Sequence, residues 1–248
     1  MTVSSARLST DAVANKVLEI RDLKFRWPKA QRDLLDIPWF ALDAAERVFL
    51  QGSSGSGKSS LLALLGGVAR PRDGNVTLLG HALSDLPQKR VDQLRADHVG
   101  FVFQLFNLVP YLSALDNVML PCRFSLRRRE QVQAAGRSVN AEAARLLMQL
   151  ELSDRDLVNR RVTALSIGQQ QRVAVARALI GAPDLIIADE PTSALDEGTR
   201  ERFLELLFGE CDGRGIAILL VSHDPRIGAL FDRQVGLRDL NEAQTSHT

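Results

Sequence analysis

The sequence contains very little cysteine. Only two of its 248 residues are cysteines, Cys122 and Cys211, and they stand far apart in no metal-ligand spacing. A disulfide framework or a cysteine-based zinc site therefore has no support, and a reduced, cytosolic chain is the simplest interpretation.

Long apolar runs are also missing. The longest, at residues 61–69, falls far short of the roughly 18 residues that a membrane-spanning helix needs. Residues 1–16 are polar and small, without the apolar centre of a signal peptide. If the protein works at a membrane, we expect it to do so through a partner.

Charge of neither sign is in excess. The chain has 31 Lys and Arg residues against 30 Asp and Glu residues, a formal net charge of +1. This balance creates no strong field for polyanions, so no nucleic-acid partner is expected. A hydrophobic content of 45% is ordinary for a globular protein. The length suits one large domain, or a core with a smaller subdomain.

What is present is a stretch rich in glycine and serine around one lysine, QGSSGSGKSS at residues 51–60. Residues 52–59 fit the phosphate-loop pattern G-x-x-x-x-G-K-[ST] at every fixed position. The apolar segment 47–50 predicts a buried strand before the loop, and 59–65 predicts a helix after it. A phosphate cradle needs this context, because inward-pointing N–H groups and a helix N-terminus bind the anion. The alternative, a serine-rich linker, does not fit between a strand and a helix.

The loop residues then have predicted roles. We expect Lys58 to reach the β- and γ-phosphates of a nucleotide and the Ser59 hydroxyl to ligate Mg²⁺. The residues predicted to surround the phosphates are Gly52, Ser53, Ser54, Gly55, Ser56, Gly57, Lys58, Ser59 and Ser60. The motif predicts nucleotide binding, but it does not identify the P-loop family.

A second feature is an apolar run that ends in two carboxylates, DLIIADE at residues 184–190. A continuous apolar run is typical of a parallel strand buried on both faces. Asp189 is predicted to hold Mg²⁺ through water, and Glu190 to polarise an attacking water at the γ-phosphate. Two acids at a strand end mean little alone, but beside a phosphate loop they predict a catalytic site.

A third feature is LSIGQ at residues 165–169, before a predicted helix that runs to about residue 180. It resembles the LSGGQ signature of ABC ATPases, with Ile167 in place of a glycine. Ser166, Gly168 and Gln169 are then expected to bring a hydroxyl and a close backbone approach to a γ-phosphate. On its own, the segment would also fit an ordinary helix cap with Ser166 as the N-cap residue.

The resemblance to ABC transporter ATP-binding subunits covers residues 17–240, with six motifs in family order. It implies that Gln104 is a Q-loop glutamine that senses Mg²⁺ and links the core to a helical subdomain. By the same resemblance, Asp196 is expected to close a D-loop at 193–196 that lines the partner's site. His223 is expected to be the switch histidine that contacts the γ-phosphate.

An aromatic residue that stacks on adenine is also implied by the resemblance. Trp27 falls at the position where the family carries it. Phe25 is the alternative stacking residue, and Trp27 would then serve packing alone.

Strands alternating with helical segments predict an α/β fold, which the resemblance identifies as a P-loop NTPase (RecA-like) core with a parallel sheet. The resemblance adds an N-terminal antiparallel β part and an α-helical subdomain inserted at about 106–164. Residues 139–150 have helix composition with one apolar face. We expect a disordered segment at 1–16, a single domain at 17–240 and a tail at 241–248.

Three further stretches, LLGG at 64–67, FQLFNLVP at 103–110 and ALDNV at 114–118, resemble the branch that includes LolD, MacB and FtsE. This implies an ATP hydrolase using ATP and Mg²⁺, a head-to-tail homodimer and an FtsX/MacB-like permease for export or extraction. The resemblance also implies a peripheral membrane protein on the cytoplasmic face of the inner membrane. A force-transmitting regulator of a periplasmic process stays open, and so, with less support, does a soluble ABC ATPase.

Three consecutive arginines, Arg127, Arg128 and Arg129, fall in the expected helical subdomain, beside Arg123. The simplest interpretation is a solvated basic face. The alternative is a contact with anionic lipid headgroups or with cytosolic segments of a permease.

Overall fold

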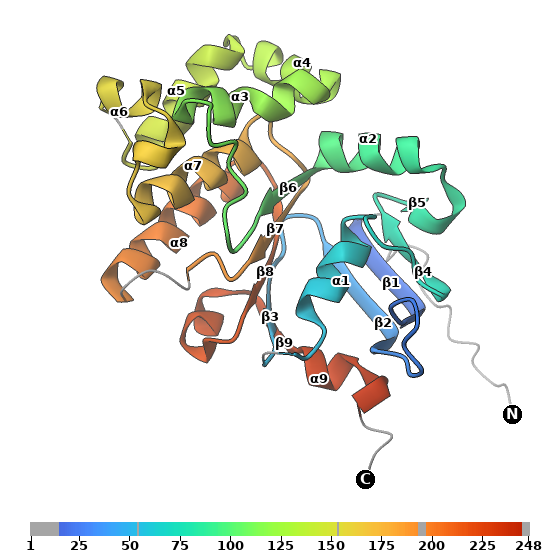
Figure 1. Ribbon diagram of the computed structural model, residues 1–248. Coiled ribbons are helices and arrows are strands. Elements are labelled where there is room, and N and C mark those ends of the chain that lie inside the picture. The colour runs from blue at the N-terminus through green and yellow to red at the C-terminus, as the bar shows by residue number, and fades with distance from the viewer. Residues whose placement is uncertain (1–14, 54, 153, 193–196, 245–248) are drawn as a thin grey trace, which may run out of the picture.

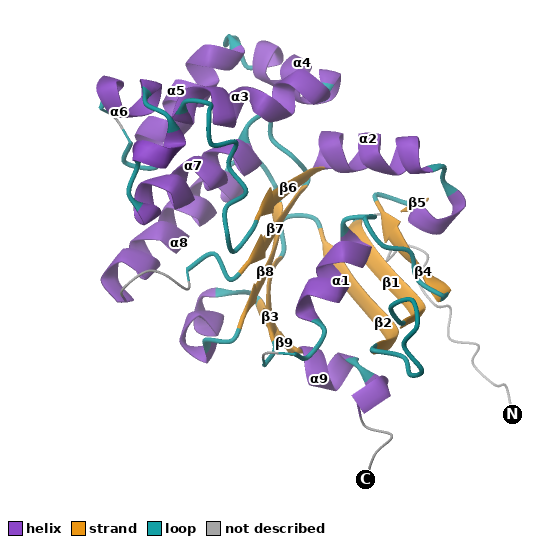
Figure 2. Cartoon of the chain, in the orientation of Figure 1, coloured by secondary structure: helices purple, strands orange, loops and turns teal. Residues whose placement is uncertain are grey.

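The computed structural model describes residues 15–53, 55–152, 154–192 and 197–244. These residues form two sheets with helices around them (Figures 1 and 2). The fold is α/β, with a parallel sheet and an antiparallel sheet, and this confirms the predicted fold class.

The larger sheet has five strands, and all of its neighbouring strands are parallel. Their order across the sheet is β6 (Val99–Val102), β7 (Leu185–Asp189), β8 (Ala217–Ser222), β3 (Arg47–Gln51) and β9 (Arg233–Gly236). Parallel strands present their carboxyl ends at one edge of a sheet. The phosphate loop, the two acids at the end of β7 and His223 after β8 therefore meet at that edge.

The smaller sheet is antiparallel and comes mostly from the first part of the chain. Its order is β2 (Leu35–Asp43), β1 (Lys16–Phe25), β4 (Asp73–Leu78) and β5 (His81–Ala82). In Figure 1 it lies beside α1 (Lys58–Leu65), the helix that follows the phosphate loop.

The other helices are α2 (Gln88–His98), α3 (Ala114–Phe124), α4 (Leu126–Ala134), α5 (Val139–Gln149), α6 (Arg155–Asn159), α7 (Ile167–Leu179), α8 (Glu197–Asp212) and α9 (Leu237–Leu240). Short 3-10 helices cover Leu83–Asp85, Val162–Ala164, Pro225–Leu230 and Glu242–Gln244. Helices α3 to α6 gather at one end of the molecule, at the top of Figure 1, within the interval where the helical subdomain is expected. None of the helices in the described residues is both long and apolar enough to cross a membrane.

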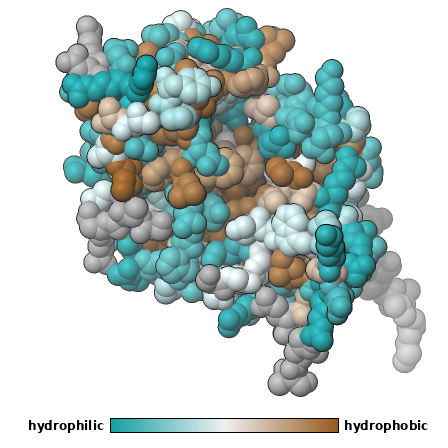
Figure 3. Space-filling view, in the orientation of Figure 1, coloured by the Kyte–Doolittle hydropathy of each residue, from teal (hydrophilic) through white to brown (hydrophobic). Residues whose placement is uncertain are grey.

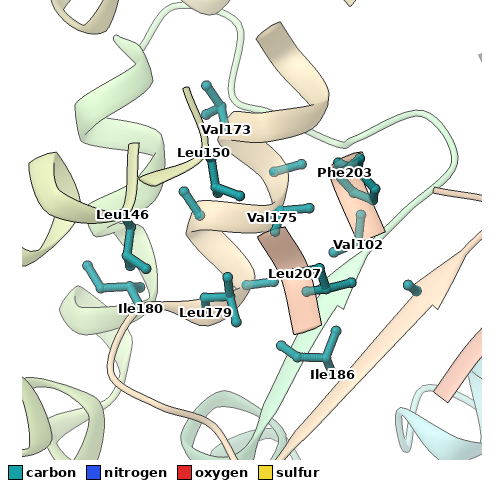
Figure 4. Close-up of a cluster of buried hydrophobic side chains, with 14 of the residues drawn as sticks. Val102, Leu146, Leu150, Val173, Val175, Leu179, Ile180, Ile186, Phe203 and Leu207 are labelled. Carbon is teal, nitrogen blue, oxygen red and sulfur yellow. The ribbon is translucent and has the colours of Figure 1, made fainter. Parts of the chain in front are cut away.

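The parallel sheet separates two apolar cores. Because successive side chains of a strand point to opposite faces, Ile186 of β7 packs with one core and Ile187 with the other. The first core includes side chains of α7, α8 and the group of helices α3 to α6. Figure 4 shows Ile186 in this core near Leu179 and Leu207. The second core holds α1 and the antiparallel sheet. Burial on both faces explains the continuous apolar run in β7.

Arg128 corrects the prediction of a solvated basic face. Its side chain is buried, with only 1% of the residue exposed. The guanidinium donates to the carbonyl oxygens of Ala96, Val99, Ala178 and Ile180, at 2.7 to 3.1 Å. Ala96 and Ala178 lie in the last turns of α2 and α7, where a helix leaves carbonyls without partners. Burial lowers the pKa of Arg128 to about 10.

The other arginines near Arg128 differ in their surroundings. Arg127 forms an ion pair with Asp184 at 2.9 Å, whereas Arg123 and Arg129 are exposed. The basic face is therefore reduced to two separated arginines.

The C-terminal segment also differs from expectation. Asn241 was expected to begin a disordered tail, but it is buried. Its side chain accepts a hydrogen bond from the Asp36 amide at 2.8 Å and donates one to the Leu34 carbonyl at 3.0 Å. At the other end, Lys16 already belongs to β1. Residues 1–14 and 245–248 lie outside the described residues.

Candidate active site

The phosphate loop joins β3 to α1, as the sequence predicts. Gly55 and Gly57 have φ angles of +76° and +99°, in the left-handed region that favours glycine. A Cβ atom at Gly57 would lie 2.8 Å from Leu35 Cδ2, so a larger residue there meets both strain and a clash. Ser54 lies outside the described residues.

The Lys58 side chain curls back over the loop. Its Nζ atom donates to the carbonyl oxygens of Gly52 at 2.7 Å and Ser53 at 3.2 Å. Within the described structure the hydroxyl of Ser56 is buried and has no hydrogen-bond partner. A lysine ammonium beside an unpaired hydroxyl fits the phosphate groups of a nucleotide.

Glu190 stands at the carboxyl end of β7 and is held from the neighbouring strand β8. Its backbone adopts a left-handed φ of +47°, and its amide donates to the Val221 carbonyl at 2.8 Å. Its carboxylate accepts from the Ser222 hydroxyl at 2.9 Å and lies 2.8 Å from His223 Nδ1. The same carboxylate is 3.6 Å from Lys58 Nζ. Glu190, His223 and the phosphate-loop lysine are therefore brought together.

Asp189 precedes Glu190 and faces the same cleft. Burial raises the pKa of the Asp189 carboxyl, the charge of Glu190 raises it further, and Lys58 opposes both. A cation placed beside Asp189 would stabilise its ionised form. Asp189, with Ser59 and Gln104 lining the same cleft, therefore suits a divalent cation.

These groups line a cleft of about 820 Å³. Gln104 joins them from the loop after β6 and is exposed to the cleft. The lining residues are Leu34, Gln51, Gly52, Ser53, Gly55, Gly57, Lys58, Ser59, Ser60, Gln104, Asp189, Glu190 and His223.

Trp27 lies beside this cleft but lines a neighbouring hollow of about 760 Å³. Its indole N–H donates to the Ser60 hydroxyl at 3.0 Å, and the residue is 48% exposed. Phe25 is only 4% exposed and meets Trp27 edge to face, with ring centroids 5.1 Å apart. Of the two candidate stacking residues, Trp27 is therefore the exposed one, and Phe25 is buried behind it.

The signature residues cap α7. The Ser166 hydroxyl accepts from the Gln169 amide at 3.3 Å, and the Gln169 side chain accepts from the Ser166 amide at 2.9 Å, which is a capping box. Ile167 is 61% exposed. A Cβ atom at Gly168 would have no atom within 4 Å, so the fold itself does not require glycine there.

The chain does not bring its signature to its own phosphate loop. Ser166, Gly168 and Gln169 are absent from the lining of the cleft. In Figure 1, α7 and α1 lie on opposite faces of the parallel sheet. Asp196, in the expected D-loop, falls outside the described residues.

Sequence reasoning missed two residues that support the site from behind its lining. Ser222 orients the Glu190 carboxylate; the only sequence signal was its place between a strand and His223. Asp224 fixes the segment after His223, and a hydrogen bond from Arg226 lowers its pKa to about 2.

Comparisons with known proteins identify the family. The family model described as ABC transporter matches residues 35–193. The lipoprotein-releasing system ATP-binding protein LolD of Hydrogenovibrio crunogenus is 40% identical over 226 residues, 91% of this chain and 92% of that protein. The macrolide export ATP-binding/permease protein MacB of Rhodopseudomonas palustris is 37% identical over 229 residues, 92% of this chain. The chain spans only 34% of that longer relative.

A solved structure gives the same result. The ATP-binding cassette MJ0796 of Methanocaldococcus jannaschii, determined as a dimer in a post-hydrolysis state with ADP and Pi, is 32% identical with a TM-score of 0.78. The match covers 91% of this chain and 95% of that one. The chain therefore belongs to the ABC transporter family, as an ATP-hydrolysing ATP-binding cassette of the LolD and MacB type.

Proposed function

We propose that two copies of the chain bind ATP and Mg²⁺, dimerise head to tail, and drive an FtsX/MacB-like permease in the export or extraction of a substrate. One observation carries the dimer: Lys58, Glu190 and His223 share a cleft from which the signature residues are absent. The dimeric state of the MJ0796 cassette supports the same arrangement.

Within one copy, the residues of the cleft would divide the work. Lys58 and the loop amides bind the phosphates, and Trp27 stacks on the adenine. Ser59, Gln104 and Asp189 would hold Mg²⁺, which neutralises phosphate charge when bound. Glu190 takes a proton from the attacking water, and His223 contacts the γ-phosphate.

The second copy would complete the site. Its Ser166, Gly168 and Gln169 approach the γ-phosphate at the start of α7, where helix amides favour an anion. Its Asp196, which the resemblance assigns to the D-loop, would join them in the partner's site. Each nucleotide would then lie between two copies, and hydrolysis would release them.

An apolar surface supports a membrane-protein partner. Figure 3 shows apolar side chains gathered in the centre of one face, where a groove of about 680 Å³ runs between the phosphate-loop helix, β6 and α3. Exposed Val68, Phe103 and Phe124 line it. Exposed apolar patches of this kind mark interaction sites. With a permease seated there, the chain would lie at the cytoplasmic face of the inner membrane.

The test is a co-purification from the cell that encodes the chain. Tagged Glu190→Gln, solubilised gently with ATP present, should retain a permease with few membrane helices and a large periplasmic domain. Lys58→Ala is the control, because it should lose any partner whose binding needs ATP. Recovery from the soluble fraction alone would overturn the membrane proposal. A partner whose periplasmic domain activates another enzyme, without moving a substrate, would favour force transmission over transport.

A further inference from the structure

Arg177 joins α7 to the loop that begins at Gln104. Its guanidinium donates to the carbonyl oxygens of Phe106 at 2.6 Å and Asn107 at 2.7 Å. These are two consecutive carbonyls, and both bonds carry the strength of a charged donor. Burial lowers the pKa of Arg177, but an arginine stays charged.

The loop has a conformation that needs such support. Phe106 and Asn107 have φ angles of +58° and +47°, so two successive non-glycine residues are left-handed. Each such residue costs about 1 kcal/mol or more unless its surroundings hold it. The Phe106 side chain packs on the core beneath α7, and the Asn107 amide donates to the Leu105 carbonyl at 2.6 Å. The guanidinium fixes the outward-turned carbonyls.

Arg177 lies near the C-terminal end of α7, which is held in place by Arg128. Arg128 binds the carbonyls of Ala178 and Ile180 at that end. The helix begins at Ile167, which is ten residues before Arg177, or roughly 15 Å along the helix axis. This N-terminal end carries the signature. A small shift where Arg177 is held is therefore transmitted along a rigid helix to Ser166 and Gly168.

We propose that Arg177 is a positioning residue that couples the Gln104 loop to the signature end of α7. Movement of Gln104 toward a bound nucleotide would pull the Phe106 and Asn107 carbonyls and, through Arg177, reorient α7 toward the partner copy. The inference rests on the roles proposed above for Gln104 and the signature. This role is specific to Arg177. The described acceptors of Arg128 lie at the ends of helices and strands rather than in the Gln104 loop.

The first experiment compares Arg177→Met with Arg177→Lys in the full-length protein. Arg177→Met removes both bonds, and kcat for ATP hydrolysis should fall by about tenfold to a hundredfold, as for a displaced catalytic geometry. The dissociation constant for ATP should stay within about twofold, because Lys58 and its loop are untouched. Arg177→Lys keeps a charged donor and should retain an intermediate kcat. Arg90→Met, on the exposed face of α2, is the control and should match the wild type.

A double-mutant cycle separates coupling from general damage. If Arg177 acts through the Gln104 loop, adding Gln104→Ala to Arg177→Met should lower kcat no further than the worse single variant, within about twofold. The coupling would be overturned if Gln104→Ala alone lowers kcat and the double variant loses the product of the two single effects. The proposed function would still stand. A Gln104→Ala variant with wild-type kcat would overturn the coupling and remove Gln104 from the proposed Mg²⁺ site, whereas the dimer proposal would stand.

Hydrogen exchange covers the case in which Arg177→Met does not fold. In Arg177→Lys, amides of residues 105–108 should exchange about tenfold faster than in the wild type, while amides of α1 keep their rate. Unchanged exchange at 105–108 would mean that the guanidinium does not hold the loop, and the inference would fail.

Discussion

Glu190→Gln is expected to stop ATP turnover while leaving ATP binding intact. The amide keeps the size of the carboxylate and still accepts the hydrogen bond from Ser222, but it cannot take a proton from water. Loss of a general base costs about a hundredfold to ten-thousandfold in rate. With hydrolysis blocked, ATP should hold two copies together as a stable dimer.

Phosphate release and sedimentation with and without ATP measure both effects. The control is Glu201→Gln on the exposed side of α8, which should hydrolyse ATP at the wild-type rate and form no lasting dimer. A Glu190→Gln protein with near-normal phosphate release would remove Glu190 from the role of base.

Arg128→Met is expected to lower the free energy of unfolding by about 3 to 5 kcal/mol. Methionine fills much of the same volume but leaves four carbonyls, three of them in buried hydrogen bonds, without the guanidinium donor. Two of those carbonyls belong to the last turns of α2 and α7, so the loss loosens both helix ends at once. In a chain of this length the melting temperature should fall by roughly 10 °C.

Urea unfolding followed by circular dichroism tests this, with Arg129→Met as the matched control. Arg129 is the next residue in α4 and is exposed, so its loss should change the unfolding free energy by no more than about 0.5 kcal/mol. Equal urea midpoints for the two variants would show that the buried guanidinium adds nothing to stability.

The contrast between Arg128 and Arg129 also shows what the sequence could not predict. Motifs defined by spacing, such as the phosphate loop and the acids at the end of β7, lie between strand and helix as the sequence predicts, because strand, loop and helix follow one another locally. Burial of Arg128 depends on carbonyls from residues 96, 99, 178 and 180, far away in the chain. Three adjacent arginines carry no signal that separates one from the others.

Other contacts between residues far apart in the sequence were equally invisible. Asn241 looked like the start of a tail, yet it bonds to backbone groups some 200 residues earlier. Arg177 lay in a predicted helix, but its carbonyl partners become visible only once the left-handed turn at Phe106 and Asn107 is known. Trp27 and Phe25 were alternatives for stacking, and only the structure shows that Phe25 is buried whereas Trp27 is exposed.

The most direct test of a site shared between two copies is a complementation of two inactive variants. Lys58→Ala removes the phosphate-loop lysine. Gly168→Asp puts a negative charge where the signature would meet a γ-phosphate, at a position where the fold has room for a side chain and a helix start favours an acid. Each variant alone should be inactive.

Mixed in equal amounts, the two variants should regain up to about a quarter of wild-type ATPase activity, because half of the dimers then hold one complete site out of two. That result requires the phosphate loop of one copy to work with the signature of the other. A mixture as inactive as its parts would mean that the signature serves its own chain's nucleotide, and the head-to-tail account would be wrong.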